Sequence, residues 1–531
     1  MSLLAYFGKR LVLIGIAVLP LTALAQGVIV TPAAQHDHLP SLRGIFPKPE
    51  DLSEGKHVRE VKHIPHLSAP GNVVDSSVQG LPGVSSAALT TAGLGFAGVG
   101  NGDYGFIPNA APPDTNGAMG ATQYVQWVNE SFAVFDKTTG TRFYGPATGN
   151  TIWAGFGGGC ETNNDGDPIV KWDNFAQRWV MMQFSVSTKP YLQCVAVSQT
   201  ADATGAWNRY AFAYQNFPDY PKVGVWSDAY YVTFDMFSGN AFAGAMICAY
   251  DKAAMLAGLP AHMQCVQLST SYGGLLPADP DGASPIAPGA PNYLLNFTGG
   301  TQLNLWKFAL NWSNPSLSKL TGPTPIPVSG FTAACNGGSC IPQPSTSNAL
   351  DSLGDRLMYR LAYRYLPASA SQPGRESLLV THSVNASDAT RRKPHTAVRW
   401  YEVRNPGGTP VIFQSGTYQP DSTSRWMSSG AMDKQGNIAI GYSTSSPTVY
   451  PSIAVSTRAA SDTLGILSNE STVKFGAGAQ TASLHRWGDY ASMVVDPADD
   501  CTFWFTSEYL KDSGSFNWST WISSFKISGC Q

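Results

Sequence analysis

The sequence contains few charged residues. Asp, Glu, Lys and Arg make up 13% of its 531 residues, whereas about 25% is usual in soluble domains. The formal net charge is −3, so the chain lacks the strongly basic surface on which nucleic-acid binding depends. We therefore expect no nucleic acid among its partners.

Recognisable catalytic motifs are also missing. The sequence has no P-loop, dinucleotide fingerprint or HExxH motif, and no Gly-x-Ser-x-Gly elbow between a strand and a helix. Each of these motifs places the groups that one mechanism needs, such as backbone amides around a phosphate or histidines around zinc. Those mechanisms therefore have no support in the sequence.

Long apolar runs are confined to the N-terminus. Lys9 and Arg10 precede an apolar run over 11–21, and Ala23-Leu24-Ala25 follows. This order is typical of a secretory signal peptide, so we predict that residues 1–25 are cleaved after Ala25 and that the protein is secreted or periplasmic. An uncleaved N-terminal anchor is the alternative. No later run of about 18 apolar residues occurs, so we expect a mature chain without a membrane span, acting as a monomer.

The eight cysteines form an even set, which suits an exported, oxidised protein. Their order favours local pairs, although the sequence alone leaves other connectivities open. The pairs expected are Cys160 with Cys194, Cys248 with Cys265, Cys335 with Cys340, and Cys501 with Cys530. A metal site is the alternative, but it requires closely spaced ligands with histidine neighbours.

Residues 26–110 are rich in Pro, Gly, Ser, Ala and His and show little periodicity. We interpret them as an irregular leader that adds a strand to the fold or covers one face. From residue 111 to 531, short β-branched and aromatic runs alternate with turn residues, which predicts an all-β domain. The clearest runs are 124–129, 179–184, 230–234, 304–308, 377–381 and 502–505. One short helix is expected over 251–258, capped by Asp251.

An aspartate, usually after a small residue, recurs at the start of strand patterns and marks a repeat. The positions are Asp114, Asp167, Asp228, Asp279, Asp355 and Asp489, and a further unit starts near Arg425 without the aspartate. Each unit has room for four short strands, and four-stranded sheets must stack to bury both faces. We predict a single β-propeller of seven four-stranded blades, with six or eight blades and two β-sandwiches as alternatives. The last unit shows three clear strands, so a strand from before Asp114 is expected to complete it.

Three segments resemble a known family. The segment from Thr200 to Trp207 is similar to the Asp-box S-x-D-x-G-x-x-W, with Thr204 at the usual glycine. Gly488-Asp489-Tyr490, followed by Val494-Val495-Asp496-Pro497, and the segment 113–117 with 124–129 are similar to blade starts of secreted bacterial propellers. The chain thus resembles an uncharacterised group of sialidase-like (BNR, Asp-box) β-propeller proteins over residues 110–531. The resemblance implies the fold, because the Asp-box stabilises a hairpin and does not carry catalysis.

In a propeller the innermost strands of all blades meet at one axis, so the recurring aspartates would surround one mouth of the channel. Carboxylates that share a cavity raise one another's pKa or bind a cation. The alternative is that each aspartate binds backbone amides at its own strand. Calcium is the expected metal, with Asp165 and Asp167 as ligands in the oxygen-rich turn 161–167. An Asx-rich turn without metal is the other interpretation.

Arginines and aromatic residues accompany the last three strand starts. The expected ligand-binding residues are Arg356, Arg425, Arg486, Trp426, Trp487, Asp167 and Asp355. Guanidinium forks suit carboxylates, sulfates or phosphates, and the set resembles the arginine triad of sialidase-like enzymes. Salt bridges to the aspartates are the alternative.

We therefore predict a secreted propeller that recognises an extracellular, anionic glycan or a protein at its mouth. A glycoside hydrolase or polysaccharide lyase that acts on an acidic polysaccharide is the alternative. If the chain is an enzyme, Asp489, Asp228, His485, Tyr490 and Glu508 are the candidate acid and base groups.

Overall fold

The structure is a computed structural model that describes residues 27–49, 52–60, 62–65, 75–79, 90–368, 373–388, 393–468 and 470–531. The predicted signal peptide lies outside these residues. The predicted all-β class is confirmed, and all six strand segments expected from the sequence lie in sheets. The expected short helix is also present as α2 (Lys252–Ala257), with the Asp251 side chain accepting a hydrogen bond from the amide of Ala254.

The strands form repeating units of four antiparallel strands. The first three units are β7 (Asn116–Met119), β8 (Gln123–Val128), β9 (Ser131–Asp136) and β10 (Arg142–Thr148); β11 (Ile169–Asp173), β12 (Arg178–Ser185), β13 (Tyr191–Ser198) and β14 (Trp207–Tyr214); and β15 (Phe217–Val225), β16 (Tyr230–Ser238), β17 (Ala241–Tyr250) and β18 (His262–Gln267). The next two are β19 (Leu276–Pro280), β20 (Asn292–Phe297), β21 (Gln302–Ala309) and β22 (Lys319–Pro327); and β25 (Met358–Leu366), β26 (Arg375–Asn385), β27 (Thr396–Arg404) and β28 (Val411–Tyr418). Then follow β29 (Ser424–Met432), β30 (Ile438–Ser446), β31 (Val449–Arg458) and β32 (Ser471–Lys474), and finally β33 (Ser492–Val495), β34 (Thr502–Leu510) and β35 (Trp518–Ile527).

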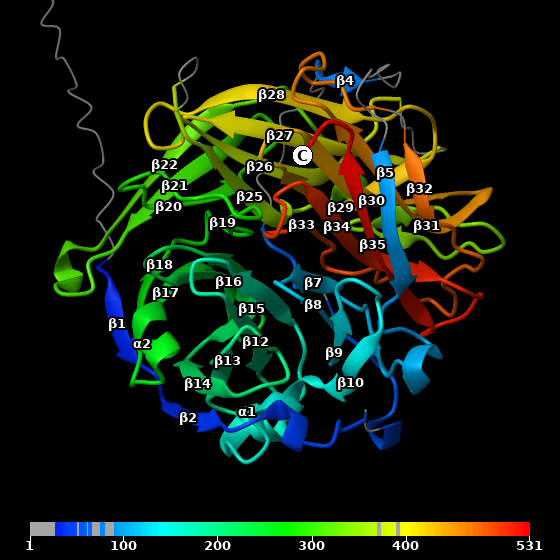
Figure 1. The fold of residues 1–531 in the computed structure, drawn as a ribbon. Helices are drawn as coiled ribbons and strands as arrows, with labels where there is room; N and C mark the ends of the chain where they lie inside the picture. The colour runs from blue at the N-terminus through cyan, green and yellow to red at the C-terminus, as the bar shows by residue number, and fades with distance from the viewer. Residues whose placement is uncertain are drawn as a thin grey trace, which may run out of the picture.

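The first strands of these units meet around a common centre. Each first strand contacts the first strand of the next unit, in the order β7, β11, β15, β19, β25, β29 and β33. The circuit closes because β33 contacts β7. Figure 1 shows the sheets arranged accordingly around the middle of the molecule. Residues at equivalent ends of the first strands are therefore neighbours in space, although they lie far apart in sequence.

The stacking of the sheets explains the apolar character of the strands. In β12, Trp179 and Met181 belong to one hydrophobic cluster, whereas Val180 and Met182 belong to another. Alternate residues of a strand point to opposite faces of its sheet. Both faces of this sheet are thus buried, and the strand consequently reads as an uninterrupted apolar run.

The leader contributes strands to several sheets. β1 (Ile29–Pro32) pairs with β18, β2 (Gln35–Leu39) with β14, and β4 (Val78–Gln79) with β28. β5 (Thr90–Ala97) pairs with β35 and gives the last sheet its fourth strand, as expected from the sequence. The described part of the leader is therefore more regular than its composition suggests. The leader also includes β3 (His57–Val58), which pairs with β6 (Ala110–Ala111), the short strand that precedes β7 in the sequence.

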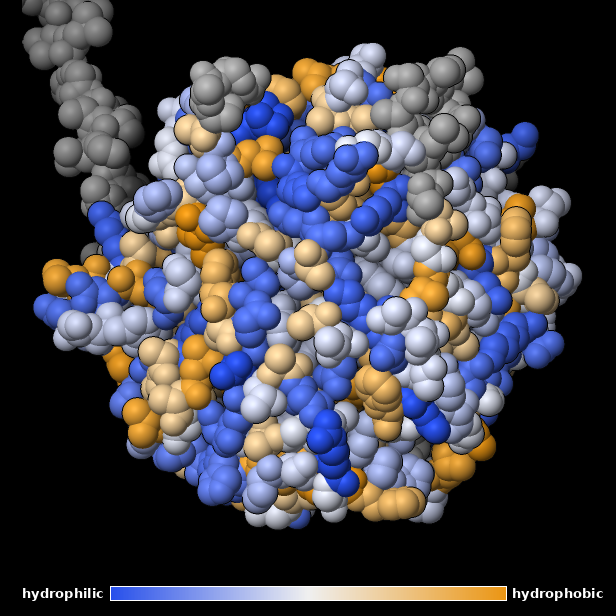
Figure 2. Space-filling view, in the orientation of Figure 1, coloured by the Kyte–Doolittle hydropathy of each residue, from blue (hydrophilic) through white to orange (hydrophobic). Residues whose placement is uncertain are grey.

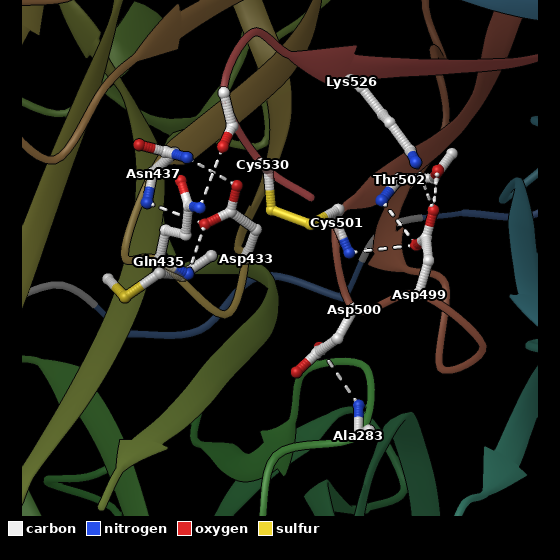
Figure 3. The surroundings of a disulfide bond; sticks show 12 residues. Ala283, Asp433, Gln435, Asn437, Asp499, Asp500, Cys501, Thr502, Lys526 and Cys530 are labelled. Atoms are coloured by element: carbon white, nitrogen blue, oxygen red, sulfur yellow. Dashed lines mark hydrogen bonds and ion pairs between the residues drawn. A yellow bond between two sulfur atoms is a disulfide. The ribbon is translucent and has the colours of Figure 1, made fainter. Parts of the chain in front are cut away.

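The four disulfides join Cys160 to Cys194, Cys248 to Cys265, Cys335 to Cys340 and Cys501 to Cys530. These are the local pairs that the cysteine order favours. Figure 3 shows the last of them, which ties the end of the chain to the turn before β34. Asp499 accepts hydrogen bonds from the amides of Cys501 and Thr502 and pairs with Lys526. The disulfides fit an oxidising compartment.

The surface is mixed in polarity. On the face shown in Figure 2, hydrophilic and hydrophobic residues are interspersed. The most exposed large apolar side chains, such as Phe46 and Phe475, come from separate segments. In the part of the chain that the structure describes, no helix has the length and apolar character needed to cross a membrane.

Candidate functional site

A pocket lies where the amino ends of the first strands converge. Its volume is about 300 Å³. The lining residues are Asp167, Asp219, Tyr220, Arg356 and Asp489, with Phe184, Val186 and Phe217 beside them and Val58, Arg59, Glu60 and Lys62 from the leader. We call this space the mouth pocket. It combines carboxylates, a guanidinium group and aromatic rings, which are the groups that bind polar organic ligands.

Three aspartates lie together beside the mouth pocket, and two of them, Asp167 and Asp489, line it. Oxygen atoms of Asp114, Asp167 and Asp489 all lie within 4.8 Å of one another. We call these residues the carboxylate cluster. They precede β7, β11 and β33, so the meeting of three first strands brings them together.

Asn129 fixes two members of the carboxylate cluster. Its amide nitrogen donates to Asp114 Oδ2 at 2.6 Å, and its Oδ1 accepts from the backbone amide of Asp167 at 3.1 Å. The backbone amide of Asp489 in turn donates to Asp114 Oδ1 at 2.7 Å. These bonds hold the three aspartates in place against their mutual repulsion.

Burial makes ionisation of these carboxyl groups unfavourable. Desolvation, followed by the charges of Asp489 and Asp167, raises the pKa of Asp114. Desolvation and the charge of Asp489 raise the pKa of Asp167 to about 6. Asp219, across the mouth pocket, has its pKa raised by desolvation and by the charge of Asp167. Perturbed carboxyl groups around a pocket are typical of binding or catalytic sites.

Backbone strain collects at the same strand starts. Asp114 and Asp167 have φ of 44° and 47°, and Tyr220 and Met427 have φ of 55° and 50°. Aspartate tolerates this left-handed region, but tyrosine and methionine enter it at a steric cost. Such strain persists only where the surroundings impose it, and it accumulates at functional sites.

Three cationic side chains balance part of the acidic charge. Arg486 pairs with Asp489, lies 3.1 Å from Asp351 Oδ2 and donates to the carbonyl of Arg59. Lys222 is buried between two aromatic rings, with its Nζ 3.3 Å from the ring centre of Tyr220 and 4.3 Å from that of Tyr490. Burial lowers the pKa of Lys222 to about 8.

The third cation, Arg356, pairs with Asp355 through Nε at 2.7 Å and Nη2 at 2.9 Å. Its guanidinium group also lies over the ring of Tyr220 at 4.5 Å. The expected ligand-binding residues Arg356 and Asp355 therefore bind each other at the edge of the mouth pocket. Only Arg356 lines the pocket itself.

Glu508 and Tyr490 lie beside the carboxylate cluster. Desolvation and the charges of Asp114 and Asp489 raise the pKa of Glu508. Glu508 Oε1 is buried and has no hydrogen-bond partner within the described structure. The hydroxyl of Tyr490 donates to the carbonyl of Pro168 at 2.9 Å, which fixes its ring against Lys222. Together with Asp489, three of the five candidate acid and base groups thus lie at or near the site.

The leader covers one side of the mouth pocket. His57 Nε2 lies 2.9 Å from Glu130 Oε1, and Arg59 pairs with the same carboxylate. The Glu130 hydrogen bond raises the pKa of His57. Arg356 and Arg486 donate to leader carbonyl groups, at Lys62 and Arg59. The site therefore uses residues from both the ring of sheets and the leader.

Two aspartates of the proposed ring lie elsewhere. Asp228 follows β15 in the turn to β16, where Tyr231 donates to it, so the aspartate near the start of this unit is Asp219 instead. Asp279 ends β19 and binds Lys171 at 2.7 Å and Arg360 at 2.8 Å. It lines a smaller pocket of about 40 Å³ at the carboxyl ends of the first strands. The expectation that these two share the mouth is wrong.

Arg425 is also outside the site. It is 1% exposed and pairs with Asp421, in the loop before β29, and with Glu470, in the segment before β32, so it forms salt bridges, but with acidic residues outside the proposed ring of aspartates. Trp426 and Trp487 are fully buried and pack on each other with ring centres 5.8 Å apart, as core residues. His485 is exposed, and its Nδ1 lies 2.8 Å from the carbonyl of Ala349.

The acidic residues of the proposed calcium turn, 161–167, have two different roles. Asp165 accepts hydrogen bonds from the amides of Val186 and Ser187, and Glu161 accepts from those of Gly155 and Gly157. These carboxylates stabilise turns, as in the interpretation without metal. Asp167, two residues further on, points instead to the carboxylate cluster.

Sequence reasoning missed four residues of the site: Asn129, Asp219, Tyr220 and Lys222. Asp219 and Tyr220 stand between Pro218 and Pro221, and prolines indicate a turn more often than an inner strand. Asn129 ends the predicted strand 124–129, directly after Val128, and this polar residue at the strand end was the available signal.

No protein-family model matches the sequence, and a search of curated proteins finds no match. Weak structural similarity extends to an exo-β-1,3-galactanase from Clostridium thermocellum, with a TM-score of 0.31 and 9% identity, covering 68% of this chain and 81% of that one. An endo-arabinase from Bacteroides thetaiotaomicron gives 0.27 and 13%, covering 56% and 94%. The catalytic domain of a GH62 α-L-arabinofuranosidase from Coprinopsis cinerea gives 0.25 and 12%, covering 60% and 93%. The sialidase-like resemblance stays a prediction, and at such low similarity the function must be argued from the residues of this chain.

Proposed function

We propose that this chain is an exported, single β-propeller of seven blades that recognises an extracellular glycan in its mouth pocket. The propeller domain would comprise residues 111–531 with β5 as the latch strand, and the leader would follow a signal peptide of residues 1–25. The closed circuit of first strands supports the fold, and the four disulfides support export.

The composition of the mouth pocket carries the functional proposal. The carboxylates can accept hydrogen bonds from sugar hydroxyl groups, and the guanidinium group can donate hydrogen bonds to them. Aromatic residues such as Tyr220 and Phe217 offer faces against which sugar rings can pack. A volume of about 300 Å³ accommodates one or two sugar units rather than a protein surface. The charge of the pocket favours a hydroxyl-rich glycan over an anionic one, because Arg356 and Arg486 already pair with aspartates.

Hydrolysis of the bound glycan is the second candidate. Its support is the spacing of the carboxylate cluster, whose oxygens lie within 4.8 Å of one another. Retaining glycosidases place their two carboxyl groups about 5–5.5 Å apart. Asp167 and Asp489 both belong to the cluster and line the mouth pocket, so a bound sugar would reach them.

The test uses the purified full-length mature chain and a panel of neutral and acidic oligosaccharides. We expect saturable binding by calorimetry, weakened at least tenfold by Asp219→Asn. Asp228→Asn is the matched control, because Asp228 lies in a turn away from the pocket. New reducing ends or unsaturated products would identify cleavage. Absence of binding across the panel, or equal binding by Asp219→Asn, would refute glycan recognition in this pocket.

A further inference from the structure

We propose that the carboxylate cluster, formed by Asp114, Asp167 and Asp489, is a calcium site beside the mouth pocket. This site shares Asp167 with the turn 161–167, in which the sequence suggested calcium, but its other ligands, Asp114 and Asp489, come from the starts of two other first strands. It also goes beyond the glycan proposal, because it can be tested without any glycan.

The geometry of the cluster matches the size of the ion. Calcium binds oxygen ligands at about 2.3–2.6 Å, so two ligand atoms on opposite sides of the ion lie at most about 4.6–5.2 Å apart. The three aspartate oxygens all lie within 4.8 Å of one another. One calcium ion can therefore contact all three. Magnesium requires about 2.0–2.1 Å and a near-octahedral arrangement, which is harder to meet with separations of this size.

Glu508 is an independent observation that points to a cation. Its carboxylate is 3% exposed, and Oε1 has no hydrogen-bond partner within the described structure. This oxygen lies beside the backbone of Gly488, the neighbour of Asp489, and interacts electrostatically with Asp114 and Asp489. Arg486 acts on Glu508 from a distance, but this buried carboxylate oxygen has no hydrogen-bond donor and stands near two further carboxylates, an arrangement that favours a cation. A cation in the cluster would add positive charge beside it.

Nearby cations neutralise only part of the acidic groups. Arg486 binds Asp489 directly, and Lys222 and Arg59 act on Asp167 from a distance. These positive charges weaken cation binding, so we expect an affinity in the range of extracellular calcium modules, about 10⁻⁴–10⁻³ M. Calcium takes six to eight oxygen ligands. Because Asp167 and Asp489 line the mouth pocket, part of the coordination sphere would face the ligand space.

The experiment is a calorimetric titration of the EDTA-treated full-length mature chain with calcium chloride, and separately with magnesium chloride. We expect one calcium ion per chain, weaker binding of magnesium, and a melting temperature that rises with calcium concentration. Asp167→Asn should weaken calcium binding at least tenfold and remove the calcium-dependent rise in melting temperature. Asn adopts left-handed backbone as readily as Asp does, so the variant keeps the geometry of residue 167.

Asp228→Asn is the matched control and should bind calcium like the unchanged chain. Glu508→Gln, which removes the charge of the fourth carboxylate, should weaken binding by a smaller factor. Wild-type protein that shows no saturable calcium binding would overturn the proposal, and so would equal binding by Asp167→Asn. Loss of glycan binding with intact calcium binding would instead refute only the proposed function.

Discussion

Asp167 should lower the stability of the calcium-free protein. Its carboxyl is 6% exposed, and its pKa rises from the usual 3.8 to about 6. Each pKa unit corresponds to about 1.4 kcal/mol, so the ionised form destabilises the fold by about 3 kcal/mol relative to the unfolded chain. Asp167→Asn removes the charge and keeps the shape. We therefore expect the variant to be more stable than the wild type at pH 8, by up to about 3 kcal/mol.

The stability difference between Asp167→Asn and the wild type should depend on pH. At pH values of about 3 and below, both folded and unfolded carboxyls are largely protonated, so the two proteins should be about equally stable, and at pH 4 the difference should still be small. The difference should grow as the pH rises from about 4 to 6 and stay constant above that. Urea unfolding in EDTA at pH 4 and pH 8 measures it. Asp165→Asn is the control in the same turn and should lose stability, because Asp165 binds the amides of Val186 and Ser187. A variant Asp167→Asn that is less stable than the wild type at pH 8, or a difference independent of pH, would refute the reasoning.

Three further predictions concern the leader, the last disulfide and the latch strand. The raised pKa of His57 means that its contact with Glu130 stabilises the leader below pH about 6.5 and is lost as the pH rises through the folded pKa. The protection of residues 52–60 against hydrogen exchange, relative to the intrinsic exchange rate at each pH, should therefore fall between pH 5.5 and 8.5, and His57→Gln should abolish that fall. Replacing Cys501 and Cys530 by serine should reduce the free energy of unfolding by about 2–4 kcal/mol, and unchanged unfolding in urea would contradict this. Gly100→Ala would place a Cβ 2.6 Å from the Cα of Ser519, so it should destabilise the protein by about 1–3 kcal/mol in thermal melting. Gly44→Ala, which meets no atom within 4 Å, should be neutral, and equal melting of the two variants would argue against close packing of the latch.

The recurring aspartate was a good guide to the repeat but an incomplete guide to the site. Asp114, Asp167, Asp355 and Asp489 do precede first strands. Asp228 fits the same local pattern, yet it lies in a turn, because a small residue before an aspartate is common to strand starts and hairpin turns. Composition alone does not separate these two uses.

The arginine expectation failed for a different reason. Arg425 and Arg486 both stand near a first-strand start, but Arg425 pairs with Glu470 in the segment before β32, whereas Arg486 pairs with Asp489 beside the mouth pocket. The direction of each side chain depends on the register and twist of its strand. The cluster of Asp114 with Asp489 likewise depends on ring closure, since these residues belong to the first and last units. Neither the side-chain direction nor the ring closure can be predicted from the sequence around each residue.

The pairing of β5 with β35 means that the last sheet is complete only when segments that lie far apart in the sequence pair. The amide of Leu94 donates to the hydroxyl of Ser524, a residue 430 positions later. During synthesis from the N-terminus, β5 is made early but cannot pair until β35 has been made. A chain cut short before that strand leaves unpaired sheet edges, which invite association and proteolysis. β5 therefore finds its partner only in chains that include β35.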